Sequence, residues 1–299
     1  MAVWPDRIAR FDPFAAGVET LRYVLLDVFT DVPLTGNQLA VFTDGRALTA
    51  PTMQAIAAEL KLSETVFLLP PEQGGDARAR IFTPAAELPF AGHPLLGAAV
   101  VLGGALRREE LLLETAAGPV PVALAPGAGS VRSGEMSQPV PTWAPFARAQ
   151  ETLAALGCVR SELPVLEYVN GPGHVMVALP DEAAVAALEP DMRALARAAG
   201  KSGVSCFAGG GGRFKSRMFA PGLGVEEDPA TGSAAGPLAV HCARHGLSAF
   251  GAQIEIRQGA EVGRPSLLRA RAEGSAAGVD SVHVGGSAVV LARAEMRAV

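Results

Sequence analysis

The chain has 299 residues, of which 49% are hydrophobic and 18% charged, as expected for a folded protein of about two domains. Its formal net charge is −5, and Lys and Arg are scattered, so no basic surface for nucleic acid is predicted. The longest apolar run, Leu95 to Leu106, is too short to cross a bilayer, and residues 1–20 do not resemble a signal peptide. Cys158, Cys206 and Cys242 form no CxxC motif and are expected to be reduced thiols of a cytoplasmic protein.

Short β-type runs alternate with Ala-rich helical runs in the first half. The pattern predicts strands over 23–29, 39–42, 65–69 and 78–82, and a helix over 52–60. A further helix over 95–102 is apolar on every side, which requires burial, and Gly103 and Gly104 are expected to end it.

The second half follows the same plan. Strands are expected over 167–169, 175–179 and 217–219, and helices over 191–199 and 234–243. The prolines of "PVPTWAP" (139–145) favour an interdomain connection. We therefore expect an N-terminal extension over 1–20, a first domain over 21–140 and a second over 141–299, with the C-terminal segment packing back on the first.

Two long segments, 81–104 and 217–246, share a sequence frame. Each has a strand ending in Phe-x-Pro, an acidic loop, a Gly followed by a polar residue, and a buried helix closing on Gly. A period of about 137 residues is too long for a solenoid. It predicts two similar domains, each with one helix surrounded by sheet; chance similarity between Gly/Ala-rich segments is the alternative.

If the two domains face each other, both helix N-termini point into the cleft between them. Free N–H donors and the helix dipole favour an anion there, and small residues allow close approach, so a small carboxylate is the expected partner. Asp228 and Ser233 add side-chain contacts, and Asp228 could accept hydrogen bonds from an ammonium or hydroxyl group. The alternative is that Asp228 caps a helix opened by Pro229.

Other kinds of site fit the sequence poorly. "GKS" at 200–202 lacks the first glycine of a P-loop, and "GGGG" at 209–212 lacks the strand–turn–helix setting of a dinucleotide site. His241 and His245 share a helix face but lie at its C-terminus, where the dipole favours His, so no metal is expected. No GxSxG motif of a serine hydrolase occurs.

Two residues of the first half could supply acid/base chemistry. Glu64 precedes an apolar strand, and a carboxylate among apolar neighbours has a raised pKa, which suits proton transfer at carbon. The alternative is an exposed Glu at a helix end. His93 lies at the start of the buried helix with Pro94 at the first helical position, so the dipole should keep its imidazole neutral; it could also simply cap the helix.

Four segments occur in the order typical of one family. "DVFTDVPLTGNQLAVF", "LSETVF", "FTPAAELPFAGHP" and "EEDPATGSAAG" resemble the phenazine-biosynthesis isomerase family, known after its member PhzF. The resemblance spans roughly residues 22 to 295 and leaves the first 20 residues outside. It implies the diaminopimelate-epimerase-like fold: two α/β domains, each a barrel-like, mostly antiparallel sheet around a central helix, with the active site between them.

The resemblance also implies a function. Such an enzyme isomerises a dihydro-hydroxyanthranilate by moving hydrogen between ring carbons, without a cofactor, and a homodimer is implied. Carried over by motif, Glu64 would shuttle the proton, and a second group would bind the substrate: Gly92, His93, Asp228, Gly232 and Ser233. Related epimerases use paired cysteines, which the matching turns lack, so a two-thiol racemase is disfavoured.

The chain departs from the family pattern at two positions. Gln38 stands where Pro is usual, and Leu95 stands where Thr is usual, in a turn expected to face the pocket. The substrate is therefore left open. A non-catalytic metabolite-binding protein and an epimerase of amino-acid-like substrates are the alternatives to a proton-transferring isomerase.

Overall fold

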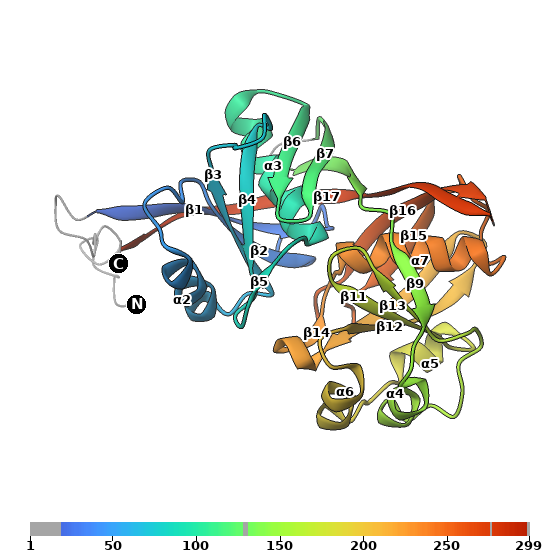
Figure 1. Ribbon diagram of the computed structural model, residues 1–299. Helices are drawn as coiled ribbons and strands as arrows, with labels where there is room; N and C mark the ends of the chain where they lie inside the picture. The colour runs from blue at the N-terminus through green and yellow to red at the C-terminus, as the bar shows by residue number, and fades with distance from the viewer. Residues whose placement is uncertain (1–18, 128–130, 276, 298–299) are drawn as a thin grey trace, which may run out of the picture.

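The computed structural model describes residues 19–127, 131–275 and 277–297. Figure 1 shows two lobes, one built from β1 to β7 with α2 and α3 and the other from β9 to β16 with α4 to α7, with the long strand β17 running through both. In the part of the chain that is described, no helix has the length and apolar character needed to cross a membrane.

The first lobe is a closed barrel around a helix. Its strands form a hydrogen-bonded ring in the order β1–β2–β3–β4–β6–β7–β8–β17 and back to β1. Helix α3 lies inside this ring and contacts every strand of it. The elements are β1 (Thr20–Val28), β2 (Asn37–Phe42), α2 (Ala50–Leu60), β3 (Glu64–Leu69), β4 (Ala77–Phe82), β5 (Glu87–Leu88), α3 (Gly92–Leu106), β6 (Glu110–Thr115), β7 (Gly118–Ala125) and β8 (Val131–Gln138).

The second lobe repeats this topology. Along β10–β11–β12–β13–β15–β16 the pairs run antiparallel, parallel, antiparallel, parallel and antiparallel, as they do along β1–β2–β3–β4–β6–β7. The elements are β9 (Thr142–Pro145), α4 (Ala149–Ala155), β10 (Leu166–Val169), β11 (Gly173–Ala178), α5 (Glu182–Ala186), α6 (Met192–Ala199), β12 (Gly203–Gly210), β13 (Arg213–Ala220), η1 (Pro221–Leu223), β14 (Val225–Asp228), α7 (Gly232–Arg244), β15 (Ile254–Gln258), β16 (Ser266–Ser275) and β17 (Gly278–Arg297). The prediction of two similar barrel-like halves, each with a central helix, is confirmed.

The central helices differ from their expected bounds. Helix α3 begins at Gly92 rather than 95, runs through Gly103 and Gly104, and ends at Leu106, where Arg107 takes a left-handed conformation. Gly103 is a packing position: a Cβ there would come within 2.4 Å of Leu124 Cδ1. The glycine therefore lets the helix pass close to the barrel wall and does not stop it.

The expected connection over 139–145 is partly a strand. β9 occupies its second half and pairs antiparallel with β10, placing Trp143 opposite Tyr168. The division near residue 140 stays a prediction. Of the expected extension, residues 1–18 lie outside the described residues, and Thr20 already belongs to β1.

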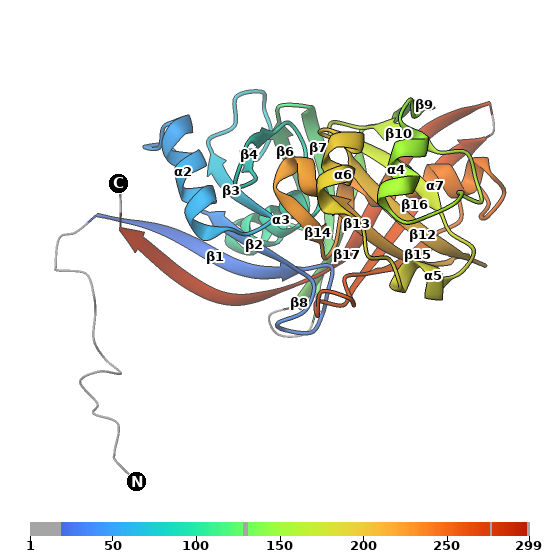
Figure 2. The ribbon, with the colours of Figure 1, turned by 90° about the horizontal axis from the view of Figure 1, so that it is seen from below.

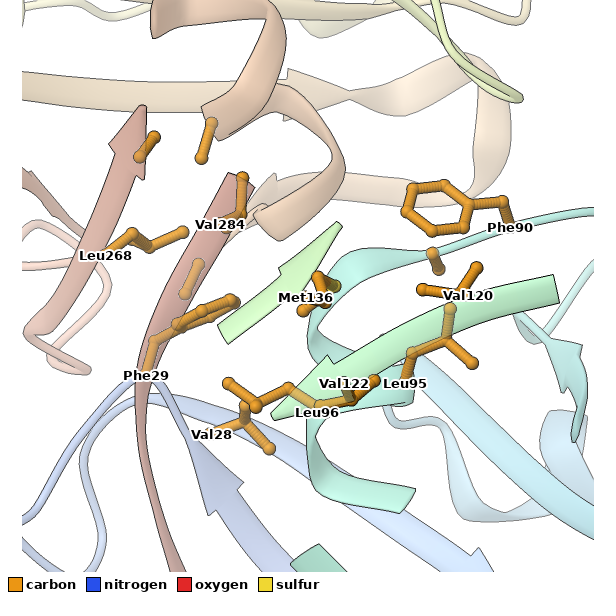
Figure 3. Packing of buried hydrophobic residues seen from close by; sticks show 14 of the residues in the cluster. Val28, Phe29, Phe90, Leu95, Leu96, Val120, Val122, Met136, Leu268 and Val284 are labelled. Atoms are coloured by element: carbon orange, nitrogen blue, oxygen red, sulfur yellow. The ribbon is translucent and has the colours of Figure 1, made fainter. Parts of the chain in front are cut away.

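The main hydrophobic core fills the space between the central helices and the barrel walls. Leu95 and Leu96 of α3 pack near Val120, Val122 and Met136 in this core (Figure 3). The expectation that Leu95 faces the pocket is wrong, because its side chain is fully buried in this core and does not line the cavity at the start of α3. A Leu at this position therefore contributes to packing.

Strand β17 joins the two lobes. One part pairs with β16 and β8, and its last part runs antiparallel to β1, from Val28 opposite Ala288 to Thr20 opposite Arg297. Figure 2 shows the two strands side by side along the lower edge of the first lobe. The lobes thus share one strand.

Candidate active site

A cavity of about 40 Å³ lies where the starts of α3 and α7 meet. Residues of both lobes line it, from β3 and α3 on one side and from β11, β12, β14 and α7 on the other. All six residues predicted to form the site are in this lining: Glu64, Gly92, His93, Asp228, Gly232 and Ser233.

Two glycines allow the helix starts to meet. A Cβ added to Gly92 would lie 2.5 Å from the carbonyl carbon of Gly232 and 2.7 Å from the Ser233 nitrogen. Within the described ranges, no side chain caps either helix. Uncapped N–H groups from two helices therefore converge on one cavity, an arrangement that favours a carboxylate.

Glu64 is the first residue of β3 and faces α3. Its Oε2 lies 3.4 Å from Nε2 of His93, and neither atom has a hydrogen-bond partner among the described residues. Burial raises the pKa of Glu64 well above its ordinary value, and the nearby charge of Asp228 raises it further. Glu64 is therefore not an exposed helix-end residue.

His93 is buried, with 3% of its surface exposed. Burial lowers its pKa to about 3, and a hydrogen bond to the backbone carbonyl of Gln38 opposes this shift. The imidazole is therefore neutral, as expected, but burial is the main cause. Pro94 is the third helical residue and not the first, because the helix begins at Gly92.

Asp228 ends β14 and receives hydrogen bonds from both lobes. Asn37 Nδ2 donates to its Oδ1 at 2.8 Å, and Thr231 Oγ1 donates to its Oδ2 at 2.5 Å. Burial raises the pKa of Asp228 to about 6, while hydrogen bonds from Thr231, Asn37 and Ser63 lower it. The residue at the N-cap position of α7 is Thr231, whose side chain makes no capping hydrogen bond, so the interpretation of Asp228 as the cap is wrong.

Sequence reasoning missed Asn37, which connects these groups. Its amide donates to Asp228 and, at 2.9 Å, to the carbonyl of Ala230, so both amide protons are used. No amide proton is then left for Nδ1 of His93, 3.2 Å from the same nitrogen, so we infer that Nδ1 carries the ring proton. Nε2 is left as an acceptor facing Glu64. A buried Asn opening a strand beside Gly36 was the available signal.

The two buried carboxyl groups have different surroundings. Asp228 has several donors to stabilise its anion, and Glu64 has the acceptor Nε2 beside it and is suited to hold a proton.

The cavity lining contains none of the three cysteines, which are free, and the described residues contain no group of three His, Cys, Asp or Glu that could hold a metal ion. The arrangement can bind an anion and move a proton beside it. His174, also missed, lines the same cavity.

Known proteins resemble this chain over most of its length. A family model described as "Phenazine biosynthesis-like protein" matches residues 26–294. The trans-2,3-dihydro-3-hydroxyanthranilate isomerase of Pseudomonas aeruginosa is 53% identical over 271 residues, covering 91% of this chain and 97% of that protein. The solved structure of a predicted epimerase from P. aeruginosa is 35% identical in sequence and has a TM-score of 0.79. The match covers 93% of this chain and 100% of that one.

A more distant structure supports the fold alone. The PhzF-family phenazine biosynthesis protein of Bacillus anthracis is 23% identical, with a TM-score of 0.79, and the match covers 93% of this chain and 99% of that one. The relatives that are 52–53% identical are isomerases, and they define this chain as an enzyme of the isomerase class. The chain belongs to the phenazine biosynthesis-like protein family, as the four sequence segments indicate.

Proposed function

We propose that the protein is a cofactor-independent isomerase that moves a proton between ring carbons of trans-2,3-dihydro-3-hydroxyanthranilate. The substrate is taken from relatives that are 52–53% identical over nearly their full length. Its carboxylate suits the paired helix starts at Gly92 and Gly232, and its amino and hydroxyl groups suit Asp228 and His93.

The observation that carries the proposal is the position of Glu64. It is an acid with a raised pKa whose Oε2 is buried, beside a neutral imidazole and in the lining that also contains the two helix starts. Such an acid gives a proton to one carbon and takes one from another, and it ends each turnover with the proton that it began with. The reaction is therefore balanced without an oxidant, a reductant or a coenzyme.

Asp228 and His93 act on the substrate without exchanging protons with its carbon atoms. Asp228 stays ionised above a pH of about 6 because donors surround it, and it accepts hydrogen bonds from an ammonium or hydroxyl group. Ser233, 6% exposed beside Gly232, adds a hydroxyl and a helix N–H to the carboxylate site. These contacts hold the reacting carbons against Glu64.

The test is Glu64→Gln, which keeps the shape and removes the proton. We expect kcat to fall by at least ~10²-fold and solvent deuterium to stop entering the product, because a general acid/base contributes roughly 10²–10⁴-fold. Substrate affinity should stay within about tenfold, or ~1.4 kcal/mol. Glu59→Gln, at an exposed position at the end of α2, is the control with the same chemistry. Turnover that survives in Glu64→Gln contradicts the proposal.

The other candidate functions have less support. A thiol racemase would need cysteines at the cavity, and burial raises the pKa of Cys206 and Cys242, which makes their thiolates harder to form. A pure binding protein has no use for a buried acid opposite the carboxylate site. Homodimerisation and a cytoplasmic location stay predictions, and light scattering on the purified protein tests the first.

A further inference from the structure

A second histidine, His174, lines the cavity and has no assigned task. It lies in β11, is 3% exposed, and neither of its ring nitrogens has a hydrogen-bond partner among the described residues. Buried polar groups without partners are rare in native proteins, since leaving one unpaired costs free energy. Two such atoms on one ring beside a cavity indicate that a bound molecule supplies the partners.

The alternation of β11 directs this ring inward. Val175 and Val177 pack in the cluster under helices α4 to α6, on the outside of the barrel, whereas Met176 and Ala178 pack in the core around α7. His174 shares the face of Met176 and Ala178, because side chains on a strand alternate. It therefore points to the barrel interior, at the end where the cavity lies.

The cavity wall beside His174 is apolar and has a glycine next to the ring. The neighbouring strand places Gly203 opposite it, and a Cβ there would lie 3.4 Å from Nδ1 of His174. Pro172, Gly173 and Met218 form the rest of this wall and offer no N–H or O–H from their side chains. A polar group of a ligand that reaches this wall meets the His174 ring.

His174 and Asp228 lie on different strands of the second lobe. In the sheet order β11–β12–β13–β14, His174 is three strands from Asp228, roughly 14 Å along the sheet. Burial lowers its pKa to about 4, so the ring is neutral near pH 7. A neutral imidazole donates one hydrogen bond and accepts one, which fits a hydroxyl or an amino group better than a carboxylate.

We propose that His174 determines substrate specificity by binding a hydroxyl or amino substituent of the substrate, at the wall opposite Asp228. The inference rests on the proposed function and adds to it. The helix starts hold the carboxylate, Glu64 moves the proton, and His174 binds one of the two remaining polar groups of the substrate, which leaves the other to Asp228 and His93.

The test compares three aromatic probes with His174→Leu and His174→Gln. The probes are 3-hydroxyanthranilate, anthranilate, which lacks the hydroxyl, and 3-hydroxybenzoate, which lacks the amine. We expect the wild type to prefer 3-hydroxyanthranilate over at least one of the two. His174→Leu should weaken its binding by about 10- to 100-fold and reduce that preference to within ~3-fold, and His174→Gln should keep part of it.

Kinetics and stability separate this role from a structural one. KM for the dihydro substrate should rise in His174→Leu while kcat changes less than ~5-fold. Without ligand, the Tm of His174→Leu should equal or exceed that of the wild type, because an unpaired polar group is removed. The matched control is His241→Leu: His241 is fully buried and bonds the Tyr168 hydroxyl at 3.1 Å, so this variant should lose stability and keep the probe preference.

Several results would overturn the inference. These are an unchanged probe preference in His174→Leu, a loss confined to kcat, or a fall in Tm like that of His241→Leu with the preference kept. Active Glu64→Gln with a lost preference in His174→Leu would refute the proposed reaction and leave the binding role standing. Inactive Glu64→Gln with an unchanged preference would do the reverse.

Discussion

Glu64 and Asp228 both line the cavity, and their surroundings assign their carboxyl groups different protonation states. Three donors stabilise the Asp228 anion, whereas Glu64 faces an acceptor. In the unfolded chain Glu64 regains its ordinary pKa, near 4.3. The folded protein therefore holds a proton on Glu64 in a pH range where the unfolded chain has lost it.

This difference predicts how stability depends on pH. Because the native state binds more protons, stability falls as pH rises from the unfolded pKa to the raised folded pKa of Glu64. Gln has no proton to lose, so Glu64→Gln should match the wild type near pH 4 and have the higher Tm at pH 8. Thermal unfolding across this range measures the gap, and a variant less stable than the wild type at pH 8 contradicts the assigned pKa direction.

Among the elements, the starts of α3 and α7 have the tightest contact at the site. Gly92→Ala would push a Cβ into the backbone of Gly232 and force the two helices apart. We expect kcat/KM to fall at least ~100-fold, since a shift of about 1 Å at a site can cost that much. Stability should fall by roughly 1–3 kcal/mol, measured by urea unfolding.

Gly104→Ala on the same helix is the matched control. Gly104 is exposed, and a Cβ there would meet no atom within 4 Å. The change should leave activity intact and stabilise the protein by about 0.5–1 kcal/mol, because Ala loses less backbone entropy than Gly in a helix. Equal effects of the two changes would show that the contact at Gly92 is unimportant.

The sequence predicts elements best where a local signal coincides with the structural role. The Gly-His and Gly-Ser pairs marked the region of the two helix starts, although the helices were expected from 95 and 234 and begin at Gly92 and Gly232. The end of α3 was misjudged because Gly103 serves packing, which only the position of Leu124 reveals. His174 was missed because the sequence around it does not show which residue of the neighbouring strand lies opposite. That residue is Gly203, which has no side chain to fill the space beside the ring.

At the scale of the whole molecule, Arg264 ties the two lobes together. Its guanidinium pairs with the fully buried Asp27 of β1, and it also donates to the carbonyls of Gly36 at 2.6 Å and Thr35 at 2.8 Å. These contacts fix the turn that leads into Asn37. No local sequence pattern predicts this contact between the lobes, because Arg264 and Asp27 lie 237 positions apart.

Removing this arginine should be costly. Arg264→Met leaves Asp27 buried without its partner, and we expect a loss of about 3–5 kcal/mol at pH 7 in urea unfolding. Asp27→Asn combined with Arg264→Met should lose less than the sum of the single changes. The exposed Arg46–Asp44 pair is the control, where Arg46→Met should cost no more than ~1 kcal/mol. A cost that small for Arg264→Met would contradict the role assigned to it.

The sharing of β17 has a consequence for biosynthesis. Arg22 on β1 meets Glu295 on β17, which is 273 positions later in the chain. At roughly 5–20 residues per second, a ribosome takes about 15–60 s to make the segment between them. Throughout that time one edge of β1 has no strand to pair with, so the growing chain is exposed to pairing with other chains until the final strand is made.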